Sequence, residues 1–294
     1  MELGRLGVWV GMDRISAAAG AEFARRVEGW GDGALWLPES RGRNALVHSS
    51  WLLANTQKLV VATGIANIYA RDPMAMANGQ RALAEQSEGR FLLGVGVSHR
   101  PMVEGLRGHN YGRPVATMRA YLEAMKAAPY VVAAAPRETP PTVVAALGPR
   151  MLALSGELAD GAHPYNTIAA HTAKARAILG PGKILAPEVW VLLATDPSAA
   201  RRAAREALAA YLQLENYVNA WRGQGFSDDD LAGGGSDRFV DAIVAWGDED
   251  ALRRRIQEHW DAGADHVCIQ PISLAGGRAI DQRVLELLAP AAQS

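Results

Sequence analysis

The sequence predicts an α/β fold in which eight parallel strands alternate with helices and close into a (β/α)8 barrel of the TIM type, with insertion segments. Eight short apolar runs recur along the chain, and helical patterns separate most of them. The runs are apolar almost throughout, as in strands that are buried on both faces. The chain has 294 residues, 49% of them hydrophobic, and no Pro/Gly/Ser-rich linker, so residues 1–294 are expected to form one domain.

The predicted elements alternate regularly in the first two thirds of the chain. The apolar runs predict strands at 6–10, 34–37, 59–66, 91–97, 142–146, 161–163, 186–194 and 265–270. Helical spacing of apolar residues predicts helices at 19–31, 47–55, 74–87, 115–127, 149–159, 169–179 and 250–262. Pro73 is expected to open the third of these helices, because a first-turn residue needs no intrahelical N–H bond.

The extra chain lies mainly between the last two strands, in residues 197–247. Residues 199–223 have helical patterns, 225–237 carry DDD and GGG and predict a mobile loop, and 239–246 predict a short helix. This insertion could cover the barrel mouth as a lid or form a solvated surface connection, and its composition favours neither.

Composition excludes several classes of function. With a net charge of -1, the chain has no basic field to hold nucleic acid or an anionic membrane. The lone Cys268 lies in an apolar run, which predicts a buried thiol in a reducing, cytoplasmic compartment, and no run approaches ~18 apolar residues. The motifs HExxH, GxxxxGK[ST] and GxSxG are absent, so the chemistry is expected to come from a bound organic cofactor.

The most informative stretch runs from 59 to 99, with TGI at 63–65, RDP at 71–73 and GRFLLGVG at 89–96. It predicts a strand, a turn, a helix and a second strand. Gly64 and Gly96 fall near the carboxyl ends of these two strands, where a barrel binds its ligand and where a missing Cβ would let a flat ring approach the backbone. A dinucleotide fingerprint is not met, because His99 stands where the third glycine of GxGxxG belongs.

Together with AALGPRM at 145–151, these motifs resemble the luciferase-like family, in particular its deazaflavin (coenzyme F420) oxidoreductases. The resemblance implies hydride transfer between F420 and a small organic substrate, and a homodimer. The face that contains Trp51, Leu52 and Leu53 is a candidate dimer surface. Two alternatives stay open: an FMN-dependent monooxygenase of the same fold, and a barrel that binds a cofactor without catalysing a reaction.

The resemblance also implies positions for the cofactor ring. Family members have a non-prolyl cis peptide at the bulge that corresponds to Gly64-Ile65, behind the central ring. The end of the next strand, comprising Gly96, Val97, Ser98 and His99, is expected to border the cofactor or substrate, although His99 could instead be a solvated loop residue. Asn67 could bond the polar edge of the ring or cap its own strand.

Glu39 ends the second strand, where a side chain projects into the barrel mouth. The family's dehydrogenases commonly have a histidine there, so Glu39 is a departure that leaves alcohol oxidation in doubt. We expect Glu39 or His99 to handle the proton that accompanies hydride transfer, provided that Glu39 is desolvated. Alternatively, Glu39 forms an ion pair with Arg41 or Arg43.

The turn between the predicted strand 142–146 and helix 149–159 is the candidate phosphate site. Backbone N–H groups of Ala146, Leu147 and Gly148 can meet phosphate oxygens there, with help from the helix dipole. Arg150 has two alternative roles, an added charge at this site or a solvated helix residue. By resemblance, the phosphate would be the phosphodiester of the cofactor.

Overall fold

The computed structural model describes residues 1–276 and 279–293, and its central feature is a curled, entirely parallel sheet. The strands are β1 (Leu6–Trp9), β2 (Ala34–Leu37), β3 (Val60–Thr63), β4 (Ala66–Asn67), β5 (Phe91–Gly96), β6 (Thr142–Val144), β7 (Gly161–Ala162), β8 (Ile184–Leu185), β9 (Glu188–Leu193), β10 (Val244–Gly247) and β11 (Val267–Pro271).

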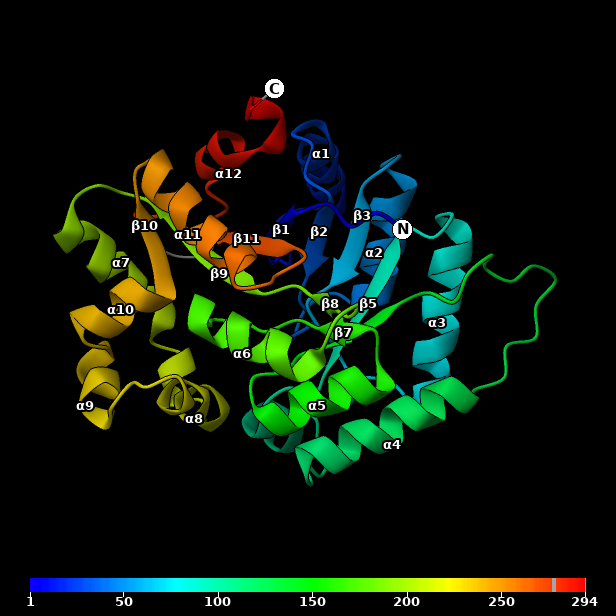
Figure 1. Cartoon of the computed structure of the whole chain (residues 1–294). Helices are drawn as coiled ribbons and strands as arrows, with labels where there is room; N and C mark the ends of the chain where they lie inside the picture. Colours follow the sequence, from blue (N-terminus) through cyan, green and yellow to red (C-terminus); the bar gives the residue numbers. More distant parts are fainter. Residues whose placement is uncertain (277–278, 294) are drawn as a thin grey trace.

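Helices surround this sheet (Figure 1). They are α1 (Ala17–Gly29), α2 (Ala45–Ala54), α3 (Pro73–Gln86), α4 (Pro114–Ala127), α5 (Pro149–Leu158), α6 (Ala169–Leu179), α7 (Pro197–Leu208), α8 (Glu215–Gly223), α9 (Asp228–Leu231), α10 (Asp237–Ile243), α11 (Glu249–Asp261) and α12 (Gln282–Leu288). Short π or 3-10 turns are η1 (Pro101–Leu106), η2 (Tyr211–Gln213), η3 (Ala232–Gly234) and η4 (Pro290–Gln293).

The strand order confirms the predicted barrel. Neighbours run β10-β9-β11-β1-β2-β3-β5-β6-β7-β8, and β4 extends the edge of β5. The chain turns between β8 and β9, so that β8 pairs with β7 while β9 pairs with β11. Glu188 N–H still donates to the Pro164 carbonyl and Cys268 N–H to the Pro187 carbonyl, which closes the ring. The carboxyl ends of all the strands therefore meet at one face, the barrel mouth.

The core is as apolar as the strand runs predict. All residues of β1, β2, β3 and β5 are buried, and Cys268 is completely buried, as expected. Pro73 does open α3, where the Asp72 side chain accepts from the Ala75 N–H as the N-cap. The predicted strand 59–66 is interrupted, because Gly64-Ile65 separates β3 from β4.

In the insertion, the expected mobile loop was wrong, and the expected short helix is present with different bounds. Residues 225–237 were expected to form a mobile loop, but they contain the short helix α9. This helix begins with a capping box at Ser227, and its Asp230 forms an ion pair with Arg238. The short helix expected at 239–246 is α10, which ends at Ile243, and Trp246 belongs to strand β10. β10 pairs with residues 190–193 of β9. The four residues 244–247 form too short an apolar run to predict this pairing.

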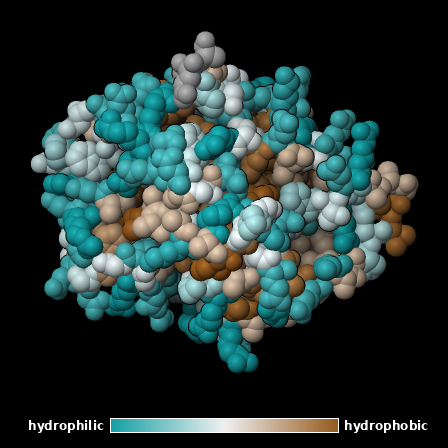
Figure 2. Space-filling view, viewed as in Figure 1, coloured by the Kyte–Doolittle hydropathy of each residue, from teal (hydrophilic) through white to brown (hydrophobic). Residues whose placement is uncertain are grey.

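The insertion helices α7 to α10 gather at one side of the barrel (left in Figure 1). On the opposite side, the loop between α4 and β6 projects from the body, and its Val131 and Val132 are exposed. Figure 2 shows apolar side chains at that edge, and further apolar patches lie among the hydrophilic side chains across the middle of this face. Across residues 1–276 and 279–293, no helix has the length and apolar character needed to cross a bilayer.

Candidate active site at the barrel mouth

The bulge between β3 and β4 forms one wall of the mouth. Its Gly64-Ile65 peptide bond is cis, the geometry that the resemblance implied. Trp9 Nε1 donates to the Gly64 carbonyl at 2.9 Å. A Cβ at Gly64 would lie 2.5 Å from Trp9 Nε1 and 2.9 Å from His163 Nε2, so protein side chains occupy the space on that side. The glycine is thus required by packing within the barrel, whereas the sequence had suggested that it clears space for a ring.

The missing side chain of Gly96 likewise leaves room for a neighbour, the side chain of Ile65. A Cβ at Gly96 would lie 2.6 Å from Ile65 Cγ1 and 2.7 Å from Ile65 Cδ1. The Ile65 side chain therefore lies on the backbone of β5, and its half-buried position leaves part of it facing the mouth. Val97 and Ser98 follow Gly96 and are also half-buried, with Ser98 in the left-handed region at φ 57°. The Ile65 side chain thus packs directly on the end of β5, where Val97 is also apolar and Ser98 is polar.

Both carboxylate oxygens of Glu39 accept hydrogen bonds. Oε1 accepts from the Ala45 N–H at 3.1 Å and from the Arg71 guanidinium, and Oε2 accepts from the Asn67 N–H at 2.9 Å. The Glu39 and Arg71 side chains are only 5% and 9% exposed. The partner is Arg71 of the RDP motif, and not Arg41 or Arg43. These bonds join the ends of β2 and β4 to the start of α2, which indicates an organising role for this carboxylate.

Asn67 caps its own strand. Its Oδ1 accepts from the Tyr69 N–H at 2.9 Å, and its N–H donates to Glu39. The side chain is buried, so its orientation is set by local backbone bonds.

His99 connects the end of β5 to the insertion. Its Nδ1 lies 3.0 Å from Asn216 Oδ1 in α8, and its ring packs on Tyr217 with 5.5 Å between centroids. Because the amide oxygen accepts, Nδ1 carries the hydrogen and Nε2 presents a lone pair. Burial lowers the pKa of His99, and the bond to Asn216 opposes that effect. His99 is therefore a half-buried, neutral imidazole and not a solvated loop residue.

The turn at 145–150 adjoins the end of β6. Ala146 is buried, Leu147 is half-buried, and Gly148 and Arg150 are exposed. Gly148 is the N-cap of α5 and supplies no side chain to satisfy the first N–H groups of that helix. A Cβ at Gly148 would meet no atom within 4 Å. The backbone of this turn is therefore exposed at Gly148 and Arg150, and phosphate binding by Ala146, Leu147, Gly148 and Arg150 stays a prediction.

Sequence reasoning missed an aromatic group that closes the mouth on the side of β7 and β9. The Tyr165 hydroxyl donates to Gln270 Oε1 at 2.8 Å and lies 2.8 Å from the Tyr211 hydroxyl. Tyr165 also packs on Trp9 at 5.3 Å between centroids. Tyr211 comes from the insertion, so its contact could not be read from spacing. The only signal was the polar HPYN sequence directly after the predicted strand 161–163.

Two titratable groups lie inside the barrel beneath this aromatic group. Glu188 is completely buried, and burial raises the pKa of its carboxyl well above the ordinary range. Its Oε2 accepts from the Asn166 N–H at 3.2 Å. Burial likewise raises the pKa of the Cys268 thiol, which keeps it protonated and unreactive.

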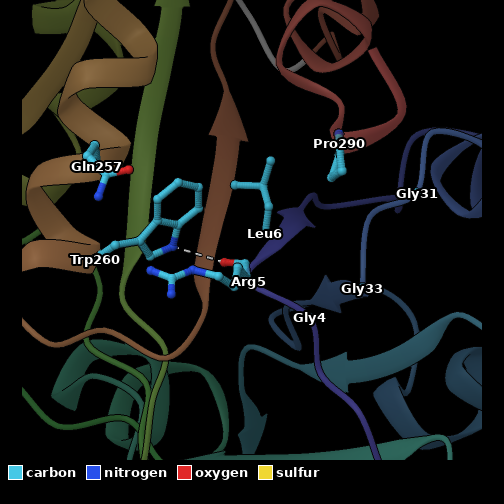
Figure 3. A pocket seen from close by; sticks show the side chains of 8 residues that line it. All are labelled: Gly4, Arg5, Leu6, Gly31, Gly33, Gln257, Trp260 and Pro290. Atoms are coloured by element: carbon cyan, nitrogen blue, oxygen red, sulfur yellow. Dashed lines mark hydrogen bonds between the residues drawn. The ribbon is translucent and has the colours of Figure 1, made fainter. Parts of the chain in front are cut away.

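A hollow of about 540 Å³ lies at the opposite end of the barrel (Figure 3). Trp260 of α11 forms one wall, donates from Nε1 to the Arg5 carbonyl at 3.1 Å, and carries the Arg5 guanidinium over its ring. The hollow borders the start of β1. In barrels of this type, residues at this amino-terminal face serve stability, whereas reactions occur at the mouth.

Comparison with known proteins identifies the family and the fold. The family model described as luciferase-like monooxygenase matches residues 2–266. A Mycobacterium tuberculosis protein, provisionally named a coenzyme F420-dependent oxidoreductase, is 31% identical over 127 residues, a stretch that spans 43% of this chain but only 36% of that protein.

Solved structures show the same fold at low identity. An F420-dependent secondary alcohol dehydrogenase in complex with an F420-acetone adduct superposes with a TM-score of 0.77 at 14% identity, over 100% of both chains. The oxygenating constituent of 3,6-diketocamphane monooxygenase from Pseudomonas putida, in complex with FMN, gives 0.68 at 16% identity over 98% of this chain and 97% of that one. Since the family model covers most of the sequence, the chain belongs to the luciferase-like monooxygenase family.

Proposed function

We propose that this protein is an oxidoreductase that binds coenzyme F420 at the barrel mouth and transfers a hydride between its deazaflavin ring and a small organic substrate. The observation that carries the proposal is the apolar surface made by Ile65 on Gly96, at the ends of adjacent strands. A planar ring would lie on this surface. Family membership and the F420-dependent relative support the choice of cofactor.

The residues of the chain fit such a group at both of its ends. Ile65 would support the ring, while the open N–H groups of the turn at 146–150, with Arg150 beside them, would hold a phosphodiester. When bound, the deazaflavin supplies a two-electron hydride chemistry that the side chains lack. Val97 and Ser98 would border the ring from the end of β5.

We assign the accompanying proton to His99 before Glu39. The lone pair on His99 Nε2 is available to accept a proton, since Nδ1 is bonded to Asn216. Both oxygens of Glu39 are already occupied by Arg71 and by backbone N–H groups. Glu39 would then act by holding the β2 and β4 ends in place. The insertion, anchored at His99 through Asn216, would exclude water from the mouth.

The FMN-dependent monooxygenase is the second candidate, because one structure with this fold holds FMN. FMN ends in a phosphate monoester dianion, whereas the phosphate of F420 is an internal phosphodiester with a single negative charge, so the turn at 146–150 would meet different charges. The third candidate is a barrel that binds a cofactor without catalysing a reaction.

Parallel titrations with F420 and FMN, followed by tryptophan quenching, distinguish the first two candidates, and an assay of hydride transfer to candidate substrates then tests for catalysis. Micromolar or tighter binding of F420 with little response to FMN is the expected result. Preference for FMN would support the monooxygenase, and binding of neither would contradict both.

We further propose a homodimer that forms over α2. The predicted surface needs correction, because Leu52 and Leu53 are buried within the core at 0% and 4% exposure. The exposed apolar side chains are instead Val47 at 71%, Trp51 at 45% and, at the start of α3, Met74 at 50%. An exposed patch of this kind is typical of an interface.

A further inference from the structure

We propose that His171 is the residue that aims the backbone of the turn at 146–150 toward an anion. The inference rests on the proposed function, because the anion is the phosphate group of the bound cofactor. It assigns His171 a positioning role: the imidazole does not touch the phosphate but sets the direction of a peptide group that does.

The central contact joins α6 to the turn. His171 Nε2 lies 2.7 Å from the Leu147 carbonyl oxygen, and the imidazole is 6% exposed. The carbonyl can only accept, so Nε2 carries the hydrogen. A buried, short hydrogen bond of this kind fixes the carbonyl more firmly than water would.

The direction of this carbonyl decides the direction of the next N–H group. The peptide between Leu147 and Gly148 is planar, and in a trans peptide the C=O and N–H bonds point in opposite directions. Because His171 holds the Leu147 oxygen toward α6, the Gly148 N–H points away from α6. Gly148 is the exposed N-cap of α5, and none of the described residues accepts a hydrogen bond from this N–H, which leaves it free for an anion.

The first turn of α5 adds to the same site. Pro149 has no N–H, and Met151 and Leu152 donate to the Gly148 carbonyl. Among the described residues, the N–H groups of Gly148 and Arg150 have no acceptor, and both lie at the positive end of the helix dipole. A rotated Leu147-Gly148 peptide would replace one of these donors with a carbonyl oxygen, which repels an anion.

The surroundings keep His171 neutral. Burial lowers its pKa, and the bond to Leu147 opposes that effect. Nδ1 is buried and has no partner among the described residues. Neighbouring Thr172 bonds the buried His259 at 2.8 Å, which anchors α6 to α11 and so fixes the position from which His171 reaches the turn.

The test compares ligands with and without the phosphate group. Wild type, His171→Leu and His171→Gln are titrated with F420 and with its ribityl deazaflavin, which lacks the phosphodiester and the chain beyond it. Leucine removes the donor, whereas glutamine retains an N–H near the position of Nε2. FMN and riboflavin form the equivalent pair if wild type prefers flavin. Thermal unfolding of each variant without ligand checks that it is folded, and His171→Asn replaces His171→Leu if the latter does not fold.

We expect His171→Leu to weaken binding of F420 by about tenfold, the effect of losing one well-directed hydrogen bond to a charged group, with binding of the ribityl deazaflavin changed less than about twofold. His171→Gln should restore most of the loss. Equal weakening of both ligands would show a merely structural role and overturn the inference, as would unchanged F420 binding. If wild type binds neither pair, the proposed function itself fails, and this inference fails with it.

Discussion

Asp32 gives the sharpest prediction about stability. It lies in the loop between α1 and β2, its side chain is 5% exposed, and neither carboxylate oxygen has a partner among the described residues. Burial raises the pKa of this carboxyl from 3.8 to about 7. Asp32→Asn removes the ionisable group and keeps the size of the side chain.

The magnitude follows from linkage. A carboxyl whose pKa is raised in the folded state stabilises the fold below its unfolded pKa, and this contribution is lost as pH rises through the folded pKa. A pKa difference of about 3 corresponds to about 4 kcal/mol at 1.36 kcal/mol for each pH unit. Relative to Asp32→Asn, the wild type should therefore lose about 2 kcal/mol of unfolding free energy between pH 5 and pH 7, because the unfolded carboxyl is already partly ionised at pH 5 and the folded one is half ionised at pH 7.

Urea denaturation at pH 5, 6, 7 and 8 measures this difference. Asp250→Asn removes one exposed carboxylate and serves as the control for the change in net charge. Asp32 is at the amino-terminal face of the barrel, so cofactor binding should not change. Unfolding free energies of wild type and Asp32→Asn that stay parallel from pH 5 to pH 8 would refute the reasoning, because the carboxyl would then be solvated or paired.

Three further predictions concern the mouth and the surface. Gly96→Ala should cost about 1–3 kcal/mol of unfolding free energy by pushing on Ile65, and adding Ile65→Ala should recover most of it; no recovery would contradict the packing argument. Glu39→Gln should cost about 3–5 kcal/mol because it leaves the buried Arg71 charge unpaired, and adding Arg71→Met should cost little more. Strictly additive losses would argue against the pair. Trp51→Glu should convert a dimer into a monomer in sedimentation velocity, and an unchanged mass would exclude this face as the interface.

Much of the barrel could be predicted from local patterns, because a parallel strand buried on both faces leaves a distinctive apolar run. β1, β2, β5 and α3 lie within a few residues of their predicted bounds. β10 was missed because its role depends on pairing with β9, a partner more than 50 residues away in the chain. The helix in 225–237 was missed because Gly and Asp clusters favour a loop, whereas Ser227 and Arg238 stabilise a helical turn here.

The candidate site shows a similar division. The strand ends placed Glu39, Gly64 and Gly96 at the mouth without any tertiary information. Their partners could not be inferred in that way. The pairing of Glu39 with Arg71 spans 32 residues, and its geometry depends on how the RDP turn packs under β4. The contacts that join the insertion to the barrel, such as that of His99 with Asn216, span 117 residues and have no periodic signature.

The most direct test of the central claim is a crystal structure of the protein with F420 bound. The proposed function predicts that the deazaflavin ring lies against Ile65 at the ends of β3 and β5, within reach of His99, with the phosphodiester at the Gly148 turn. A ring bound elsewhere, for example in the hollow beside Trp260, or a phosphodiester far from Gly148, would contradict it.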